Sequence, residues 1–183
     1  MAGDGVVNVF ALRGSVYVRL GKNDEALADF EKAISLGVED AAVYNERGTV
    51  YLNSNQFDKA LADFNMALSL DPENPITYYN RGIFYITTGE YELAVLDYDR
   101  AISLDPAVPQ FFNNRGMAYY IMKDMPNAIA DFDRAINLKP DYADGLQNRG
   151  NAYVESGQYD LAIKDYTQVV ALEPDASDAF YNR

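Results

Sequence analysis

The stretch YYNRG at residues 78–82 returns along the chain at a fixed interval. It reads FNNRG at 112–116 and LQNRG at 146–150, and FYNR stands at 180–183. The arginine of this stretch recurs every 34 residues, at Arg13, Arg47, Arg81, Arg115, Arg149 and Arg183. Self-similarity at a period of roughly 20–50 residues is the signature of a repeat architecture, so this interval decides the fold.

Further positions keep the same register as this arginine. A glycine follows each arginine from Arg13 to Arg149, and an alanine and an aromatic residue recur in the second half of every repeat. The frame that contains them divides the chain into five repeats and the start of a sixth, at 7–40, 41–74, 75–108, 109–142, 143–176 and 177–183. We therefore expect residues 1–183 to form a single array without a linker.

Each repeat is expected to fold as two antiparallel helices joined by a short turn. In the third repeat, helical steps of three and four residues connect Tyr78, Gly82, Tyr85 and Ile86. Gly89 can close this helix in the left-handed conformation, and the corresponding residues are Gly21, Asn55, Lys123 and Gly157. Among them a lysine is the least suited to that conformation. A second apolar stripe runs from about Glu92 to the Asp-Pro step at 105–106, and Gly82 and Ala94 are expected where the two helices cross.

This pattern resembles that of the tetratricopeptide repeat (TPR) family. In the third repeat the matching residues are Tyr78, Gly82, Tyr85, Ala94, Tyr98, Ala101 and Pro106. The match extends over residues 7–176, with Leu146, Val169 and Val38 as mild departures. The resemblance implies an all-α fold, an α-solenoid of antiparallel helical hairpins in a right-handed superhelix. It also implies a concave groove lined by the first helices and a role in protein–protein interaction.

The recurring arginine is matched by an aspartate in the second helix of each repeat. These aspartates are Asp29, Asp63, Asp97, Asp131 and Asp165. We expect them to form ion pairs with the arginines, either within or between hairpins, which fix the helix packing. The motifs DYD at 97–99 and DFD at 131–133 resemble acidic metal motifs, but carboxylates two residues apart on a helix point in different directions and cannot share an ion.

The asparagine of the repeated stretch gives the candidate binding site. It precedes the arginine by one residue, and the resemblance places it in the concave groove, where Asn80, Asn114, Asn148 and Asn182 would form a ladder. An asparagine amide can clasp one peptide unit because it both donates and accepts hydrogen bonds. The arrangement resembles the asparagine ladder in the TPR region of O-linked N-acetylglucosamine transferase. The alternative is that these asparagines are polar residues on a solvated face, inherited by every repeat.

Apolar residues of the third and fourth repeats are expected beside this ladder. Together with the ladder, the candidate peptide-binding residues are Tyr79, Ile83, Asn113, Met117 and Tyr120. An apolar centre with polar clasps is the usual anatomy of a binding hot spot. The alternative is that several of these side chains, Tyr120 among them, pack against the adjacent hairpin.

The composition excludes several classes of function. The chain has no histidine and no cysteine, which removes the Ser-His, Cys-His and zinc constellations, so we expect neither catalysis nor a metal or cofactor site. Its net charge of −13 disfavours nucleic acid and anionic membrane surfaces as partners. No apolar run approaches the ~18 residues of a membrane span, and MAGDG is no signal peptide, so we place the chain in the cytoplasm.

The sequence therefore predicts a non-catalytic interaction scaffold that binds a peptide segment of a protein partner. Two alternatives stay open: a substrate-docking region of a larger multidomain enzyme, and a homotypic assembly module. A solenoid normally needs polar caps, and neither VVNVFAL at 6–12 nor SDAFYNR at 177–183 resembles one. We expect end-to-end self-association at high concentration, with Phe180 in the contact.

Overall fold

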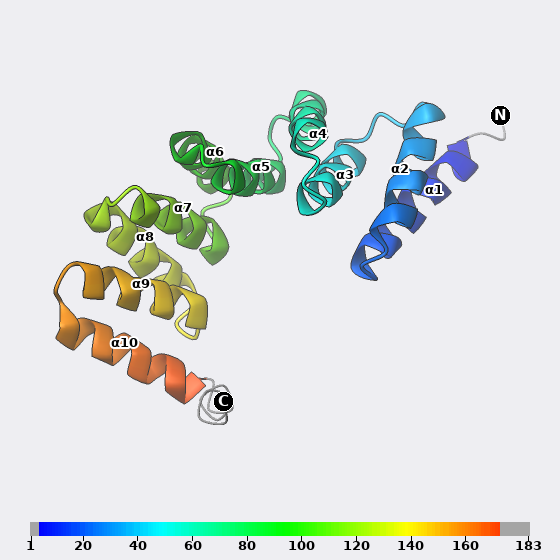
Figure 1. Cartoon of the computed structure of the whole chain (residues 1–183). Coiled ribbons are helices and arrows are strands. Elements are labelled where there is room, and N and C mark those ends of the chain that lie inside the picture. The colour runs from blue at the N-terminus through cyan, green and yellow to red at the C-terminus, as the bar shows by residue number, and fades with distance from the viewer. Residues whose placement is uncertain (1–3, 173–183) are drawn as a thin grey trace. The chain divides into compact units, whose positions relative to one another are not determined.

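The computed structural model describes residues 4–172, and over that range it is entirely helical (Figure 1). The chain has the all-α fold of a helical-hairpin solenoid that the sequence predicts. First helices alternate with second helices, and their bounds are α1 Asp4–Arg19, α2 Asn23–Ser35, α3 Ala41–Asn53, α4 Phe57–Leu70, α5 Pro75–Thr88, α6 Tyr91–Leu104, α7 Pro109–Ile121, α8 Met125–Leu138, α9 Ala143–Glu155 and α10 Tyr159–Leu172.

The chain divides into two compact parts, residues 1–84 and residues 85–183. In the first part α1 packs on α2 and α3 packs on α4, and α3 also contacts both helices of the preceding hairpin. In the second part α7 packs on α8 and α9 packs on α10, while α9 contacts both α8 and α7. The assignment of all 183 residues to one array with the repeat bounds given above remains a prediction.

Every hairpin turn contains a residue in the left-handed region, as the sequence predicts. The φ angles are 69° at Gly21, 57° at Asn55, 89° at Gly89, 64° at Lys123 and 72° at Gly157. Lys123 adopts this conformation although it is neither glycine nor asparagine. Its ammonium nitrogen lies 5.6 Å from the centroid of the Tyr120 ring and 3.5 Å from Oε2 of Glu155. Of the five hairpin turns, the turn at Lys123 therefore carries backbone strain.

The periodic glycine allows close contact between the two helices of a hairpin. A Cβ atom on Gly116 would lie 2.7 Å from Cε1 of Phe132, and one on Gly48 would lie 3.0 Å from Cε1 of Phe64. The glycine thus leaves room for the aromatic ring of the second helix. Both Gly82 and Ala94 are buried.

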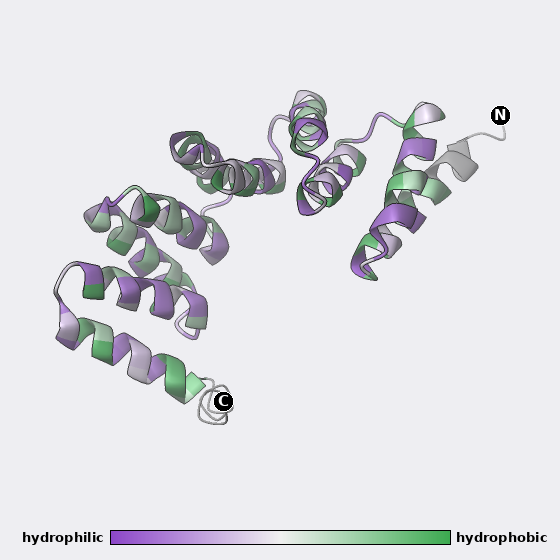
Figure 2. Ribbon diagram, in the orientation of Figure 1, coloured by the Kyte–Doolittle hydropathy of each residue, from purple (hydrophilic) through white to green (hydrophobic). Residues whose placement is uncertain are grey.

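Amphipathic helices build the core of each part. Figure 2 shows hydrophobic and hydrophilic residues interspersed along the helices, as expected when one face of each is buried. The aromatic residue of the second helix has no exposed surface in four repeats, at Phe30, Phe64, Tyr98 and Phe132. Each such ring would contribute roughly 1.5–3 kcal/mol of burial free energy, so this position is the main anchor of the hairpin.

Candidate first-helix interaction face

The arginines and aspartates pair within hairpins, which settles the choice that the sequence left open. Nε of Arg47 donates to Oδ2 of Asp63 and its Nη2 donates to Oδ1, each at 2.7 Å. The same two-bond geometry joins Arg13 to Asp29, Arg115 to Asp131 and Arg149 to Asp165. Bidentate pairs of this kind fix the relative position of the two helices.

The paired aspartates raise the pKa of the arginines that they bind. The hydrogen bond to Asp165 raises the pKa of the Arg149 guanidinium above its ordinary value, against the opposing effect of burial, and Asp133 adds to the increase. Asp165 is only 5% exposed, and Arg149 is its ion-pair partner. These arginines therefore have a structural role.

In the second part of the chain, further bonds tie consecutive hairpins to one another. Nη1 of Arg115 donates to Oδ1 of Asp99 at 2.5 Å, and Nη1 of Arg149 donates to Oδ1 of Asp133 at 2.6 Å. The carboxylates of the DFD motif thus face different arginines: Asp131 binds Arg115, whereas Asp133 binds Arg149. This arrangement gives both acids a structural role.

The asparagines of the repeated stretch bond to asparagines of the preceding first helix. Nδ2 of Asn80 donates to Oδ1 of Asn45, and Nδ2 of Asn148 donates to Oδ1 of Asn113, each at 3.0 Å. Nδ2 of Asn113 donates in turn to Oδ1 of Asn114 at 3.2 Å. The structure gives these asparagines a packing role, because each amide pair links two consecutive first helices. The bonded residues are 35 positions apart, one more than the repeat, so the period alone does not reveal the pairing.

The predicted site residues fall into two groups. Tyr79, Asn80 and Ile83 lie on α5, and all three are partly buried. Asn113, Asn114, Met117 and Tyr120 lie on α7, and Asn148 lies on α9. Asn182 lies outside the described residues. The structure brings the three asparagines of α7 and α9 into one hydrogen-bonded group.

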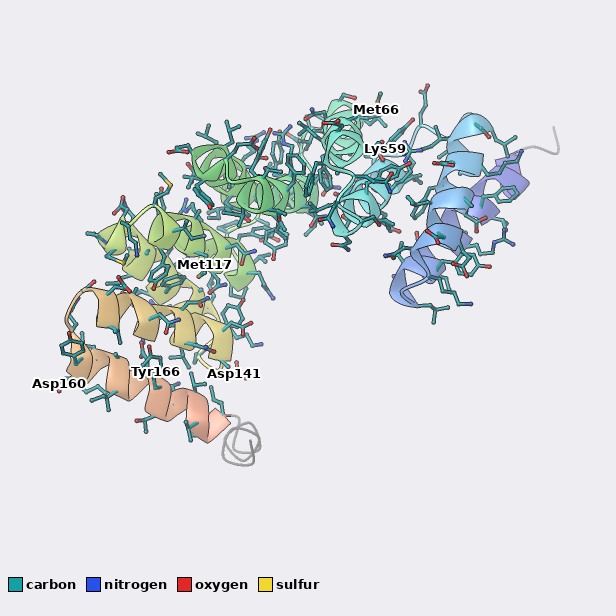
Figure 3. All side chains as sticks on the ribbon, in the orientation of Figure 1. Lys59, Met66, Met117, Asp141, Asp160 and Tyr166 are labelled. Carbon is teal, nitrogen blue, oxygen red and sulfur yellow. The ribbon has the colours of Figure 1, made fainter. Side chains whose placement is uncertain are left out.

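Several of these side chains also serve the protein core. Asn113 is only 5% exposed. Met117 and Tyr120 pack against the buried cluster of Ala128, Phe132 and Ala152, and Figure 3 shows Met117 on α7. The more exposed residues of the same helices are Gln110, Ile121, Gln147 and Val154. Asn148, Ile121 and Val154 are therefore better placed to meet a ligand than Asn113 is.

Two further surfaces are apolar and uncovered in the described part of the chain. On α10, Ile163, Tyr166, Thr167 and Val170 line an open pocket of about 320 Å³, and Tyr166 lies between α9 and α10 (Figure 3). On α1 the exposed apolar side chains are Val9, Leu12 and Val16, and the exposed Leu20 follows directly after the helix. The predicted contact residue Phe180 lies outside the described residues.

The described helices include none with the length and apolar character needed to cross a bilayer. A search among curated proteins finds no match to the sequence.

Solved structures share the fold of the chain over nearly its whole length. A MamA fragment from Desulfovibrio magneticus RS-1 is 21% identical, with a TM-score of 0.84 over 95% of this chain and 98% of that one. PilF from Pseudomonas aeruginosa is 20% identical, with a TM-score of 0.84 over 93% of this chain and 78% of that one. YrrB, described as a TPR protein with an unusual peptide-binding site, is 21% identical, with a TM-score of 0.75 over 100% of this chain and 97% of that one. At these identities the likeness establishes the fold alone.

Family models describe the same repeat along the sequence. Models of the tetratricopeptide repeat match residues 12–75, 48–112, 109–142, 132–164 and 150–183. Together with the helical hairpins and the register of the arginine, glycine and aromatic positions, these matches show that the chain belongs to the tetratricopeptide repeat family.

Proposed function

We propose that this chain is a non-catalytic interaction scaffold that binds an extended peptide segment of a protein partner on its first helices, in the groove that the family pattern implies. The asparagine pair on α7 and α9 carries the proposal. Asn148 is partly exposed, and the bond to Oδ1 of Asn113 uses one of its two amide hydrogens. Its second hydrogen and its carbonyl oxygen can meet the C=O and N–H of a peptide backbone.

The hydrogen bond to Asn113 supports this role because it holds the Asn148 amide in place before a ligand arrives. A side chain fixed in advance loses less entropy on binding than a free one. Ile121 and Val154, which are 38% and 40% exposed, offer apolar contact near the ends of the same two helices. The peptide-binding site named in the description of YrrB is consistent with such a use of the fold.

The net charge of −13 favours a neutral or basic peptide over an acidic one. It also makes nucleic acid an unsuitable partner, because binding to phosphates requires basic patches. The cytoplasmic location inferred from the sequence stays a prediction. No observation on the described residues favours substrate docking for a larger enzyme over general peptide binding.

A peptide-display selection on the full chain tests the proposal. Wild type, the double variant Asn114→Ala/Asn148→Ala and a second double variant Ile121→Asp/Val154→Asp are compared. Asn137→Ala is the matched control, since Asn137 is an exposed asparagine on the second helix α8. We expect enriched peptides to be lost on both double variants and retained on the control.

The second double variant separates binding from folding, because it leaves the amide pair intact. Enrichment of the same peptides on all four proteins would refute the proposed first-helix site.

Self-association is a second interaction that we propose, and the uncovered apolar faces of α1 and α10 favour it. Ile163 is 61% exposed on α10, and Val16 is 52% exposed on α1. Contact between two such faces would remove apolar surface from water, which stabilises a complex.

A further inference from the structure

We propose that the apolar face of α10 binds helix α1 of a second copy of the chain, in the same register that the chain uses between its own consecutive hairpins. The inference rests on the self-association proposed above and is independent of peptide binding. The contact joins the α1 face of one copy to the α10 face of another, and every copy carries both faces.

The internal junctions define the register. Positions are counted from the first residue of each repeat, so position three of the repeat 41–74 is Val43. Val43 packs in one cluster with Phe30 and with Ile34 of α2. At the tenth position, Phe84 meets the rings of Phe57 and Phe64 edge-to-face, with centroids 6.3 and 6.4 Å apart. The first helix of each following repeat therefore places the residues at repeat positions three and ten against the preceding second helix.

The second part of the chain repeats this arrangement with smaller residues. A Cβ atom on Gly145, at the third position, would lie 3.3 Å from Cγ1 of Ile136. Ala152, at the tenth position, belongs to the cluster that contains Phe132 and Ile129. In both parts of the chain the third position thus lies near the isoleucine late in the preceding second helix, Ile34 or Ile136, and the tenth position packs with its buried ring, Phe64 or Phe132.

Helix α1 presents these two positions to solvent. Val9 and Val16 occupy the third and tenth positions and are 56% and 52% exposed. The corresponding residues of α3, Val43 and Val50, are 5% and 1% exposed. The apolar side chains that bury themselves at internal junctions are therefore present on α1 and uncovered.

Helix α10 presents the apolar face that would contact α1 of the second copy. Ile163, Tyr166 and Val170 correspond to Ile129, Phe132 and Ile136 of α8. Ile129 and Ile136 are partly buried, whereas Ile163 and Val170 are 61% and 56% exposed. In the proposed register Val9 of the second copy meets Val170 and Tyr166, and Val16 meets Tyr166 and Ile163.

A polar contact accompanies the apolar ones at internal junctions. Nη1 of Arg115 donates to Asp99, and Nη1 of Arg149 donates to Asp133. Arg13 holds Asp29 with Nε and Nη2, and its Nη1 has no acceptor within the described residues. The Arg13 side chain is 52% exposed, against 20% for Arg115.

The α10 residue that corresponds to Asp99 and Asp133 is Thr167. Its hydroxyl donates to the Ile163 carbonyl at 2.6 Å and keeps lone pairs for a donor. We expect Nη1 of Arg13 in the second copy to donate to this hydroxyl. The substitution Thr167→Asp would introduce the carboxylate found at this position in Asp99 and Asp133.

A second copy supplies Val9 and Val16 at the same repeat positions that Val43 and Val50 fill at an internal junction, and this match favours a second copy as the occupant of the α10 face.

Sedimentation velocity on the full chain, from about 10 µM to about 1 mM, tests the proposal, because the association is concentration-dependent. We expect wild type to associate, and Val16→Glu and Ile163→Glu each to weaken association on the order of 100-fold by burying an unpaired charge. Thr167→Asp should tighten it about tenfold through a charge-assisted bond to Arg13. Leu96→Glu is the control, since Leu96 is 62% exposed on α6 and belongs to neither face.

Mixing the two weakened variants gives the sharpest test. Val16→Glu keeps an intact α10 face and Ile163→Glu keeps an intact α1 face, so an equimolar mixture should form a heterodimer although each protein alone stays monomeric. A monomeric wild type at about 1 mM would overturn self-association itself. Association that survives both single substitutions, or a mixture that does not complement, would overturn the proposed register.

Discussion

Nη1 of Arg149 donates a hydrogen bond to Oδ1 of Asp133 across the junction between two consecutive hairpins, at 2.6 Å. The same guanidinium holds Asp165 of its own hairpin with its two other donor atoms. One side chain thus fixes both the packing within a hairpin and the packing between hairpins. Arg115 combines the same two functions at the preceding junction, since it binds both Asp131 and Asp99.

The two bonds of Arg149 should differ in their contribution to stability. Arg149→Met leaves Asp165, whose side chain is 6% exposed, buried without a counter-ion, and we expect a loss of about 3–5 kcal/mol. Asp133→Ala removes a partner whose side chain is 44% exposed, and we expect a loss below about 1 kcal/mol. Denaturant unfolding followed by circular dichroism measures both, and equal losses would contradict the assignment.

The left-handed turn at Lys123 should be a site where glycine is preferred. With φ at 64°, Lys123→Gly should raise the free energy of unfolding by about 1 kcal/mol, because a side chain is strained in this region. The exposed pair with Glu155 contributes little that would be lost. Gly157→Ala, at φ 72° in the equivalent turn, is the reverse control and should lose about 1 kcal/mol. A destabilised Lys123→Gly protein would show that the lysine contacts outweigh the strain.

The buried hydroxyl of Thr77 should reduce stability. Thr77 has no exposed surface, and its Oγ1 has no hydrogen-bond partner in the described structure. Thr77→Val keeps the shape of the side chain and removes the unpaired hydroxyl, so we expect a gain of about 1 kcal/mol. Val43 occupies the same repeat position, and Val43→Thr should lose a similar amount. If thermal unfolding places both variants below wild type, the hydroxyl of Thr77 has a partner after all.

Alkaline pH should destabilise the fold through its buried tyrosines. Burial raises the pKa of Tyr51 above its ordinary value, with Arg47 opposing the increase. A raised pKa in the folded state means that the phenol stabilises the fold fully below the unfolded pKa of about 10, and that this contribution is lost as the pH rises through the folded pKa. Urea midpoints measured between about pH 8 and pH 11 should fall more steeply for wild type than for Tyr51→Phe. Parallel curves would contradict the prediction.

The sequence predicted the hairpins well because their determinants recur in every repeat. Gly116 leaves room for Phe132, and Gly48 for Phe64, so the 34-residue period directly records this packing. It also predicted that each arginine has an aspartate partner. It did not predict which hairpin supplies the partner, because a strict period looks the same for contacts within and between repeats.

The candidate site was predicted less completely. The pairing of Asn148 with Asn113 depends on an offset of one residue between neighbouring helices, which arises from how the hairpins stack. The burial of Asn113 follows from the same stacking. Met117 and Tyr120 were expected to meet a ligand, and the structure shows that they also contact the core cluster around Phe132. Apolar residues at helical spacing look the same in the sequence whether their face is buried in the core or binds a ligand.

The central claim is that the asparagine face of the first helices binds a peptide. The most direct test is the dissociation constant of one selected peptide, measured by fluorescence anisotropy for wild type, Asn114→Ala/Asn148→Ala and the control Asn137→Ala. The account predicts that the double variant binds at least about tenfold more weakly, since each lost backbone hydrogen bond contributes roughly 0.5–1.5 kcal/mol, while the control matches wild type. Equal dissociation constants for all three proteins would show that recognition lies elsewhere on the chain.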